Sequence, residues 1–302
     1  MLDVGDGNQI HWETWGNPTG KPALIDHGGP GSGAKRGEPR SFDLTSYRVV
    51  RFDQRGCGRS VPHAGDPSVD MSVNTTAHLL RDMELLREHL GIGRWLLNGG
   101  SWGSTLILAY AESFPSRVSE IVIPAVTMSR RSEIDWLYNG VSRFFPAEWA
   151  QFRASVAGTG SVVADYAAAM ESPSLATRSR VARAWCRWED AVLSQEPSGS
   201  PTPYGDKAPT DMLAFVRICA TYMANGMWLE DGVLLREAHR LAGIPGVLIH
   251  GWHDLGGPVR TAWELAQAWP DAELHVVYDA GHKGSATMRD LVRSALARFA
   301  ST

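Results

Sequence analysis

The chain has 302 residues, of which 43% are hydrophobic and 21% charged, so its composition is that of a globular protein with room for one sizeable core and an inserted subdomain. The net charge of −4 and the lack of a Lys/Arg-rich run exclude an electrostatic case for a nucleic-acid partner. No apolar stretch approaches the roughly 20 residues of a membrane span, so we expect no membrane partner.

The N-terminus and the cysteines indicate a cytoplasmic protein. The first 13 residues have neither a basic start nor an apolar run, so they are not typical of a secretory signal. The cysteines Cys57, Cys186 and Cys219 are few, odd in number and far apart, which predicts neither a disulfide framework nor a zinc site.

In chain order, the first 125 residues alternate short apolar runs with turn signals. Helical spacing is strongest at 74–90, where Leu79, Met83, Leu86 and Leu90 share one face, and a second, apolar helix is expected at 105–114. Strands are predicted at 23–26, 48–52, 94–97 and 120–123. Strands separated by helices imply a mostly parallel sheet with helices on both faces.

The middle of the chain has a different pattern. Residues 126–241 are helical in spacing and rich in Trp, with a Pro/Gly/Ser-rich loop at 195–209. Strand character returns at 246–250 and 274–278, and a last helix is expected at 287–299. We therefore predict an α/β fold in three segments: a first core part (1–125), an inserted helical cap (126–241) and a second core part (242–302).

The strongest chemical signal is GGSWG at 99–103, a G-x-S-x-G pattern between an apolar strand and an apolar helix. A Ser at such a tight turn has a strained backbone, and the small neighbours let the chain turn without clashes. The N-terminus of the following helix favours an oxyanion there. This context predicts that Ser101 is a nucleophile, whereas the bare pattern also occurs in ordinary Gly/Ser loops.

A serine nucleophile needs a base and a carboxylate that orients the base, in the order Ser, acid, His in this fold. Among ten histidines, His282 follows the last predicted strand and Asp254 follows the preceding one. We assign them as base and orienting acid, because open α/β sheets place their sites at the carboxyl ends of strands. Asp279 is the rival acid and is expected to brace its loop. A metal site on the nearby histidines is not expected, because the carboxylate beside them is the one the base needs.

Two backbone N–H groups are assigned to the oxyanion hole. HGGPG at 27–31 follows the first core strand, and a Gly-rich turn there can present an N–H to the substrate oxygen. The second N–H belongs to the residue after the nucleophile, so the pair is Gly29 and Trp102. The run lacks the Lys-Ser/Thr ending of a phosphate-binding loop, and no cofactor is expected.

Three further charged residues, Asp53, Arg55 and Glu189, are candidates to brace loops or to bind the substrate. Asp53 and Arg55, in DQRGCGRS at 53–60, are expected to brace the loops under the site. Glu189 lies among aromatic residues of the cap, which suits a substrate ammonium group. An ion pair with a nearby Arg on the same helix face explains Glu189 equally well at this point.

Through the motifs described above and further matching segments, the sequence resembles the proline iminopeptidases (prolyl aminopeptidases) over nearly its whole length. The resemblance implies an α/β-hydrolase core with a helical cap, no cofactor, and release of an N-terminal proline from small peptides. It implies the triad Ser101, Asp254 and His282, and it supports Glu189 as a ligand of the substrate amine. The matching segments are HGGPGSG (27–33), DQRGCGRS (53–60), GGSWGSTL (99–106), RRSEIDW (130–136), AWCRWE (184–189) and DAGH (279–282).

The substrate pocket departs from the family pattern. A second amine-binding Glu is usual in an RIENHYF-like stretch, which here reads RICATYM at 217–223 and places Cys219 and Met223 at the Glu and Phe positions. A family Arg and a ring-packing Phe correspond to Pro124 and Thr127, and a family Cys to Gly257. Losing a buried charge-assisted contact costs on the order of a hundredfold in affinity, so we expect an altered pocket.

Three functions remain open from the sequence. The first is a proline iminopeptidase with relaxed or weakened specificity, acting on a short peptide. The second is a hydrolase or acyl transferase acting on another small-molecule amide or ester in specialised metabolism. The third, which the complete triad disfavours, is a binding protein with a vestigial site. The sequence predicts no particular oligomeric state.

Overall fold

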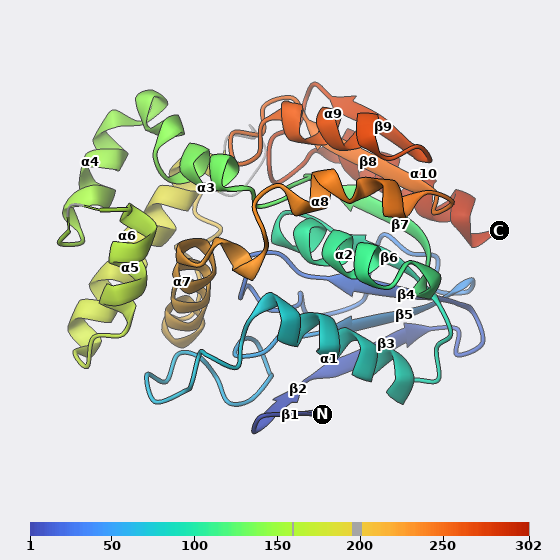
Figure 1. Ribbon diagram of the computed structural model, residues 1–302, viewed down its shortest axis with the longest axis horizontal. Coiled ribbons are helices and arrows are strands. Elements are labelled where there is room, and N and C mark those ends of the chain that lie inside the picture. Colours follow the sequence, from blue (N-terminus) through green and yellow to red (C-terminus); the bar gives the residue numbers. More distant parts are fainter. Residues whose placement is uncertain (159, 195–200, 302) are drawn as a thin grey trace.

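A seven-stranded sheet forms the centre of the molecule (Figure 1). The structure is a computed structural model that describes residues 1–158, 160–194 and 201–301. The strand order is β3-β5-β4-β6-β7-β8-β9; β3 is antiparallel to β5, and the other neighbours are parallel. The bounds are β3 Trp12–Gly16, β4 Lys21–Asp26, β5 Tyr47–Phe52, β6 Trp95–Gly99, β7 Val118–Pro124, β8 Gly246–Gly251 and β9 Ala272–Val277.

Helices cover both faces of this sheet. Successive strand residues point to opposite sides, so both faces carry apolar side chains that the helices bury. Leu24, Leu97 and Leu248 pack toward one helical layer, and their neighbours Ala23, Leu96 and Val247 pack toward the other. The first layer contains α1 (Thr76–His89), α2 (Trp102–Ser113), α8 (Val233–Arg236) and α9 (Val259–Ala268). The second contains α10 (Ala286–Ala300). The predicted fold class, a mostly parallel sheet wound on both faces, is confirmed.

A group of helices is inserted between β7 and β8 and lies at the left of Figure 1. Its members are α3 (Arg131–Tyr138), α4 (Pro146–Ala154), α5 (Val162–Met170), α6 (Leu175–Leu193) and α7 (Pro209–Ala224). They enclose a hydrophobic core of their own, in which Phe152 stacks between Tyr166 and Trp188. The insertion therefore packs as a helical cap, as the sequence predicts.

The cap boundaries at residues 126 and 241 stay predictions. Near the second boundary, α8 and the short helix Ala238–Leu241 pack into the core cluster rather than into the cap cluster. Of the predicted loop at 195–209, residues 195–200 lie outside the described residues. Residues 201–208 contain turns and no helix or strand, and α7 begins at Pro209.

Arg217 joins the cap to the core. Its Nε and Nη2 donate to the two carboxylate oxygens of Glu171, each at 2.7 Å. Its Nη1 and Nη2 also donate to carbonyl oxygens of the core loop 64–69, at 2.8 Å to Asp66 and 3.0 Å to Val69. The guanidinium group is buried, so these bonds fix α7 above the sheet edge that carries the site.

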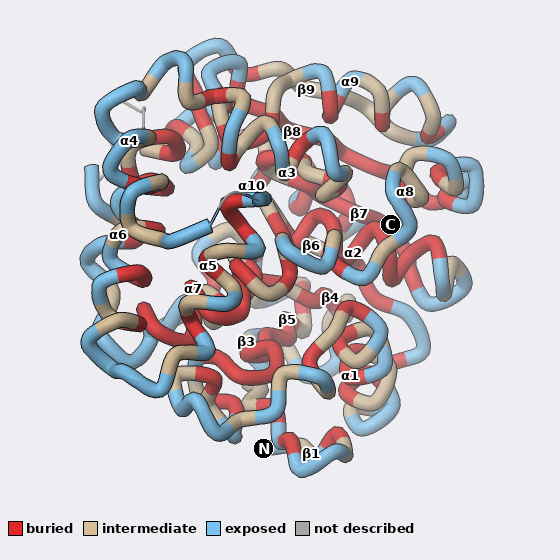
Figure 2. Tube along the Cα trace, turned by 60° about the vertical axis from the view of Figure 1, so that its left-hand side comes forward, coloured by how far each residue is buried: buried red, intermediate tan, exposed pale blue. Residues whose placement is uncertain are grey.

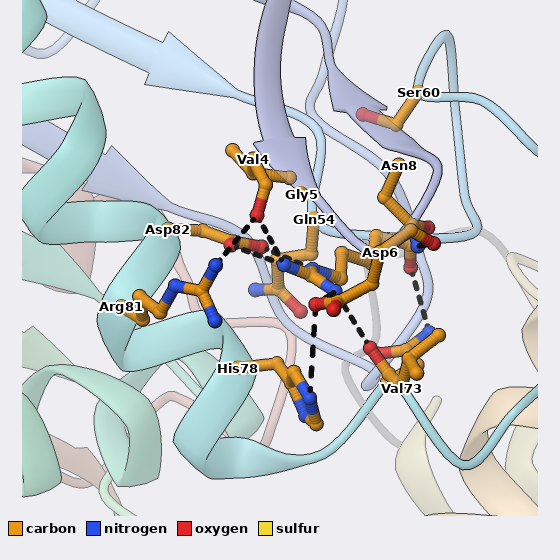
Figure 3. Close-up of polar contacts among 12 residues, drawn as sticks. Val4, Gly5, Asp6, Asn8, Gln54, Ser60, Val73, His78, Arg81 and Asp82 are labelled. Atoms are coloured by element: carbon orange, nitrogen blue, oxygen red, sulfur yellow. Dashed lines mark hydrogen bonds and ion pairs between the residues drawn. The ribbon is translucent and has the colours of Figure 1, made fainter.

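Arg55 joins the first residues of the chain to the core, and Figure 3 shows the groups around it. The separate hairpin of β1 (Leu2–Gly5) and β2 (Asn8–Ile10) approaches α1 here. Arg55 forms a two-bond ion pair with the buried Asp82 at 2.7 and 2.8 Å, and it donates to Asp6 at 3.1 Å and to the carbonyl oxygens of Val4 and Val73. All five N–H groups of the guanidinium are satisfied. Arg55 therefore braces the hairpin against α1 and the segment at Val73, whereas its expected bracing of the loops under the site stays a prediction.

The sequence missed several elements. Strands β1 to β3 were not predicted, because they are short and their apolar alternation is weak; β1 and β2 form a separate hairpin, and β3 is an edge strand of the main sheet. Helix α2 begins at Trp102 rather than at residue 105, directly after Ser101. Figure 2 shows where buried and exposed segments alternate along the chain. Within the described ranges, no helix is both long and apolar enough to cross a bilayer.

Candidate active site

The loops that follow β4 to β9 meet at the carboxyl edge of the sheet, under the cap. Ser101 lies between β6 and α2, Asp254 follows β8, and His282 follows β9. The parallel order β4-β6-β7-β8-β9 therefore brings together residues that are up to 181 positions apart.

The backbone at Ser101 is strained in the way that a nucleophile turn requires. Its φ is 58° and its ψ is −133°, a conformation that residues with side chains rarely adopt. A Cβ added at Gly100 would lie 2.4 Å from the carbonyl oxygen of Pro124, and one added at Gly103 would lie 2.8 Å from that of Asp26. Glycine at these positions lets the neighbouring strands approach closely enough to hold the turn.

A continuous hydrogen-bond chain links the three predicted triad residues. His282 Nε2 lies 3.0 Å from Ser101 Oγ, and His282 Nδ1 lies 3.0 and 2.9 Å from the two carboxylate oxygens of Asp254. The N–H groups of Gly256 and Gly257 also donate to Asp254 Oδ1, at 2.9 and 3.0 Å. Burial alone raises the pKa of Asp254, but His282, His250 and the Gly257 N–H together lower it below its usual value.

Asp279, the rival acid, has a different set of partners. It is exposed and accepts hydrogen bonds from Ser285 at 3.0 Å and Thr287 at 2.9 Å, at the start of α10. These contacts support the bracing role that the sequence suggests for it.

His250 is held by the backbone. Its Nδ1 accepts from the N–H of Val126 at 3.0 Å, so the proton is on Nε2, which donates to the carbonyl oxygen of Gly257 at 2.6 Å. Burial lowers the pKa of His250, in agreement with a neutral ring. In the described part of the chain, no group of three or more His, Cys, Asp and Glu side chains could hold a metal ion.

Gln54 connects the two loops assigned to the oxyanion hole, and sequence analysis did not single it out. Its side-chain NH₂ donates to Asp26 Oδ1 at 2.7 Å and to the carbonyl oxygen of His27 at 3.1 Å. Its Oε1 accepts from Trp102 Nε1 at 3.0 Å. Gln54 thereby ties the segment before Gly29 to the residue after the nucleophile. Trp102 N–H is one of the first N–H groups of α2, which a helix leaves without an internal partner.

A small pocket of about 50 Å³ lies over Ser101 and His282 and is lined by residues of both core and cap. Its core side includes Gly29 and Trp102, and its cap side includes Tyr138, Glu189 and Tyr204. Glu189 Oε1 accepts from Tyr138 Oη and from Trp185 Nε1, each at 2.8 Å. Burial raises the pKa of Glu189, although both hydrogen bonds act against this rise. No Arg pairs with Glu189 among the described residues, so the contacts do not match the ion-pair interpretation.

The other predicted pocket residues fall into two groups. Thr127 and Met223 line the pocket, and Thr127 Oγ1 also donates to the carbonyl oxygen of Ser101 at 2.7 Å. Cys219 is fully buried, and its thiol donates to the carbonyl oxygen of Pro30 at 3.4 Å. Gly257 lies against Thr127, where an added Cβ would be 3.3 Å from Thr127 Cγ2. The sequence missed Tyr138 and Tyr204, whose aromatic side chains gave no signal distinct from packing.

The fold and this site define an α/β hydrolase of the serine type. The chain matches the alpha/beta hydrolase fold family over residues 22–286. It is 46% identical to a protein of Streptomyces coelicolor called a probable proline iminopeptidase, covering 99% of this chain and 94% of that protein. It is also 42% identical to a proline iminopeptidase of Xylella fastidiosa, covering 93% and 90%. The chain belongs to the proline iminopeptidase family of α/β hydrolases.

Solved structures agree with this fold. The proline iminopeptidase of Mycobacterium smegmatis superimposes with a TM-score of 0.62 at 20% identity, covering 99% of this chain and 96% of that one. A proline iminopeptidase-related protein of Thermus thermophilus gives 0.61 at 24% identity, covering 98% and 95%. The resemblance expected from the sequence is confirmed, and the protein is a proline iminopeptidase-like serine hydrolase.

Proposed function

We propose that this enzyme cleaves the amide bond after the first residue of a short peptide through an acyl-enzyme on Ser101. The observation that carries this proposal is the unbroken chain Ser101–His282–Asp254 below a pocket that holds one buried carboxylate, Glu189. Relatives at 40–46% identity that are called proline iminopeptidases support a prolyl group as one acyl group.

In this mechanism His282 moves one proton in each half-reaction. Ser101 Oγ attacks the substrate carbonyl carbon while its proton passes to His282 Nε2, 3.0 Å away. The tetrahedral intermediate then expels the peptide amine, which takes that proton from His282. Water then attacks the acyl-enzyme while its proton passes to the same ring nitrogen. The second tetrahedral intermediate collapses to the free acid, and the proton returns from His282 Nε2 to Ser101 Oγ. Asp254 keeps the proton of Nδ1 in place and stabilises the imidazolium that forms.

The developing oxyanion needs donors that are fixed before the reaction. We assign this role to the N–H groups of Gly29 and Trp102, both of which border the pocket. The bonds from Gln54 to their two loops support the assignment, because they hold the two donors relative to each other.

Glu189 is the group that we assign to the substrate's α-amine. Its buried carboxylate accepts two hydrogen bonds on one oxygen, Oε1, and an ammonium group beside it would compensate the charge. Cys219 stands where the family pattern has a second Glu, and its thiol faces Pro30 rather than adding a negative charge. We therefore propose that prolyl substrates are handled poorly and that acyl groups without a free amine are tolerated. A pocket wider than the family's, suggested by Thr127 and Gly257, remains part of this proposal.

The test is a panel of p-nitroanilides that carry prolyl, alanyl and amine-free acyl groups, with Ser101→Ala, His282→Ala and the double variant. We expect each single variant to lose turnover with an unchanged circular dichroism spectrum. Because triad residues act as a unit, the double variant should be little slower than either single. Additive losses would contradict joint action, and an inert wild type toward every substrate would overturn the hydrolase proposal.

The same proposal places the activity in the cytoplasm. Cys57, Cys186 and Cys219 are all free and buried, which suits a reducing compartment. Fractionation of the source cells, followed by detection with an antibody to the chain, tests this location.

A further inference from the structure

A second, much larger cleft lies on the other side of one wall of the site pocket. Its volume is about 670 Å³, compared with about 50 Å³ for the pocket over Ser101. Most of the residues that line it belong to α3, α4, the start of α5 and the end of α7, in the cap at the left of Figure 1, and the others lie in the short segments that flank these helices. A cleft of this volume is large enough to hold a small organic group.

Three side chains line both spaces and so form the wall between them: Ile134, Tyr138 and Met223. Ile134 and Tyr138 are four residues apart on α3 and therefore share one face of that helix. Met223 approaches from α7 and, like Ile134, is only half-buried. A methionine side chain is unbranched and flexible, so it can change rotamer at low cost.

The position of the wall identifies which part of a substrate would meet it. Tyr138 belongs to the wall and donates its hydroxyl hydrogen bond to Glu189, at 2.8 Å. The wall therefore lies at the Glu189 end of the site pocket, where the proposed function puts the substrate's α-nitrogen. Whatever is attached to that nitrogen points toward the larger cleft.

We infer that the cleft is an extension of the acyl-binding pocket that receives a substituent on the substrate's α-nitrogen, a short aliphatic acyl chain above all. The inference rests on the proposed function. Trp149, Val162 and Val163 give the cleft one apolar side, which suits such a chain. The rest of the lining includes polar side chains, namely Arg131, Asp135, Asn139, Arg153, Ser161 and Asn225. An N-acylated residue other than proline keeps an N–H that can donate to Glu189, so the substituent does not leave that carboxylate without a partner.

The test uses N-acetyl- and N-hexanoyl-L-alanine p-nitroanilides, with L-alanine and L-proline p-nitroanilides as the unsubstituted substrates. An acetyl group is too short to reach past Met223, whereas a hexanoyl chain enters the cleft. We expect the wild type to show at least a tenfold higher kcat/KM for the hexanoyl than for the acetyl substrate. Two variants should remove this difference. Met223→Phe stiffens the wall, and Ala224→Trp fills the cleft from an exposed position at the end of α7.

The matched control is Ala168→Trp, on the exposed surface of α5 and outside the residues that line the cleft. It should keep the hexanoyl-to-acetyl ratio of the wild type. The inference is overturned if the wild-type ratio is close to one, if Ala224→Trp leaves it unchanged, or if prolyl and alanyl substrates are cleaved while both N-acyl substrates are not. Failure to cleave any of the four substrates would instead overturn the proposed function.

Discussion

At the scale of single residues, two aspartates near His282 are candidates for the carboxylate that orients the base. Asp254 is buried and contacts His282 Nδ1, whereas Asp279 is exposed and bonded to Ser285 and Thr287. Asp254→Asn should lower kcat about 10⁴-fold, because an amide can favour the wrong tautomer of the imidazole. Asp279→Asn should cost less than tenfold. Steady-state kinetics on the best nitroanilide measures both, and the opposite ranking would overturn the assignment.

Gln54 acts on the site through other residues, so we expect a positioning effect. Gln54→Glu keeps the shape of the side chain but places a carboxylate beside Asp26, to which Gln54 now donates at 2.7 Å. The two loops that carry Gly29 and Trp102 should then shift relative to each other. We expect kcat to fall about tenfold or more with KM nearly unchanged, because the N–H groups of Gly29 and Trp102 stabilise the transition state rather than the bound substrate.

The kcat per active site distinguishes this positioning role from a purely structural one. A variant that only loosened the fold would lower the amount of active enzyme and the melting temperature, while the fraction that stayed folded kept its normal kcat. Titration of active sites with a fluorophosphonate gives the active fraction. A normal kcat per active site in Gln54→Glu would contradict the positioning role.

At the scale of elements, the sequence could predict those whose signal is local. Strand β6, the turn at Ser101 and helix α2 form one continuous pattern, and β8 and β9 are each followed closely by a predicted triad residue, Asp254 and His282. The strands β1 to β3 were not predicted, because strands of three to five residues carry too little apolar alternation. Helix α8 is only four residues long, and its place on the core depends on contacts that no periodicity encodes.

Because sequence patterns carry mainly local information, they also missed some residues of the site. Gln54 lies in a motif that was noticed, but its bonds join three separate loops. Tyr138 meets Glu189 only because α3 and α6 pack against each other in the cap. Spacing along the chain predicts which residues share a face, and it does not predict which faces meet.

Helix α7 allows a test of the altered pocket at the scale of one element. Cys219 and Met223 are four residues apart on α7, and burial raises the pKa of the Cys219 thiol well above its usual value, so it carries no negative charge. Cys219→Glu should add a second carboxylate near Glu189 and raise kcat/KM for prolyl-nitroanilide while lowering it for an amine-free analogue. Cys219→Gln is the matched control, since it adds similar bulk without charge.

Two results would contradict the prediction for Cys219→Glu. A wild type that already cleaves prolyl substrates at high kcat/KM and ignores amine-free ones would show that the pocket is not altered in function. Equal effects of Cys219→Glu and Cys219→Gln would show that bulk, rather than charge, governs the response.

For the whole molecule, buried carboxyl groups link stability to pH. Burial raises the pKa of Glu112 to about 8 and that of Asp26 to about 7. One oxygen of each, Glu112 Oε1 and Asp26 Oδ2, has no hydrogen-bond partner among the described residues. The folded protein therefore keeps protons that the unfolded chain releases near pH 4. Where the folded state binds more protons, stability falls as pH rises, so these two groups lower stability progressively from about pH 4 up to pH 8.

Glu112 gives the sharper test because it lies on α2 and not in the site. Its neighbour Glu237 raises its pKa further, and Arg240 acts in the opposite direction. Glu112→Gln keeps the shape and removes the titration, so it should match the wild type at pH 5 and exceed it by about 2 kcal/mol in free energy of unfolding at pH 8. Urea denaturation at several pH values measures this difference. The control Glu148→Gln, at an exposed position on α4, should stay within about 0.5 kcal/mol of the wild type at every pH. If Glu112→Gln and the wild type lose stability in parallel between pH 5 and pH 8, Glu112 is not the group that links the fold to pH.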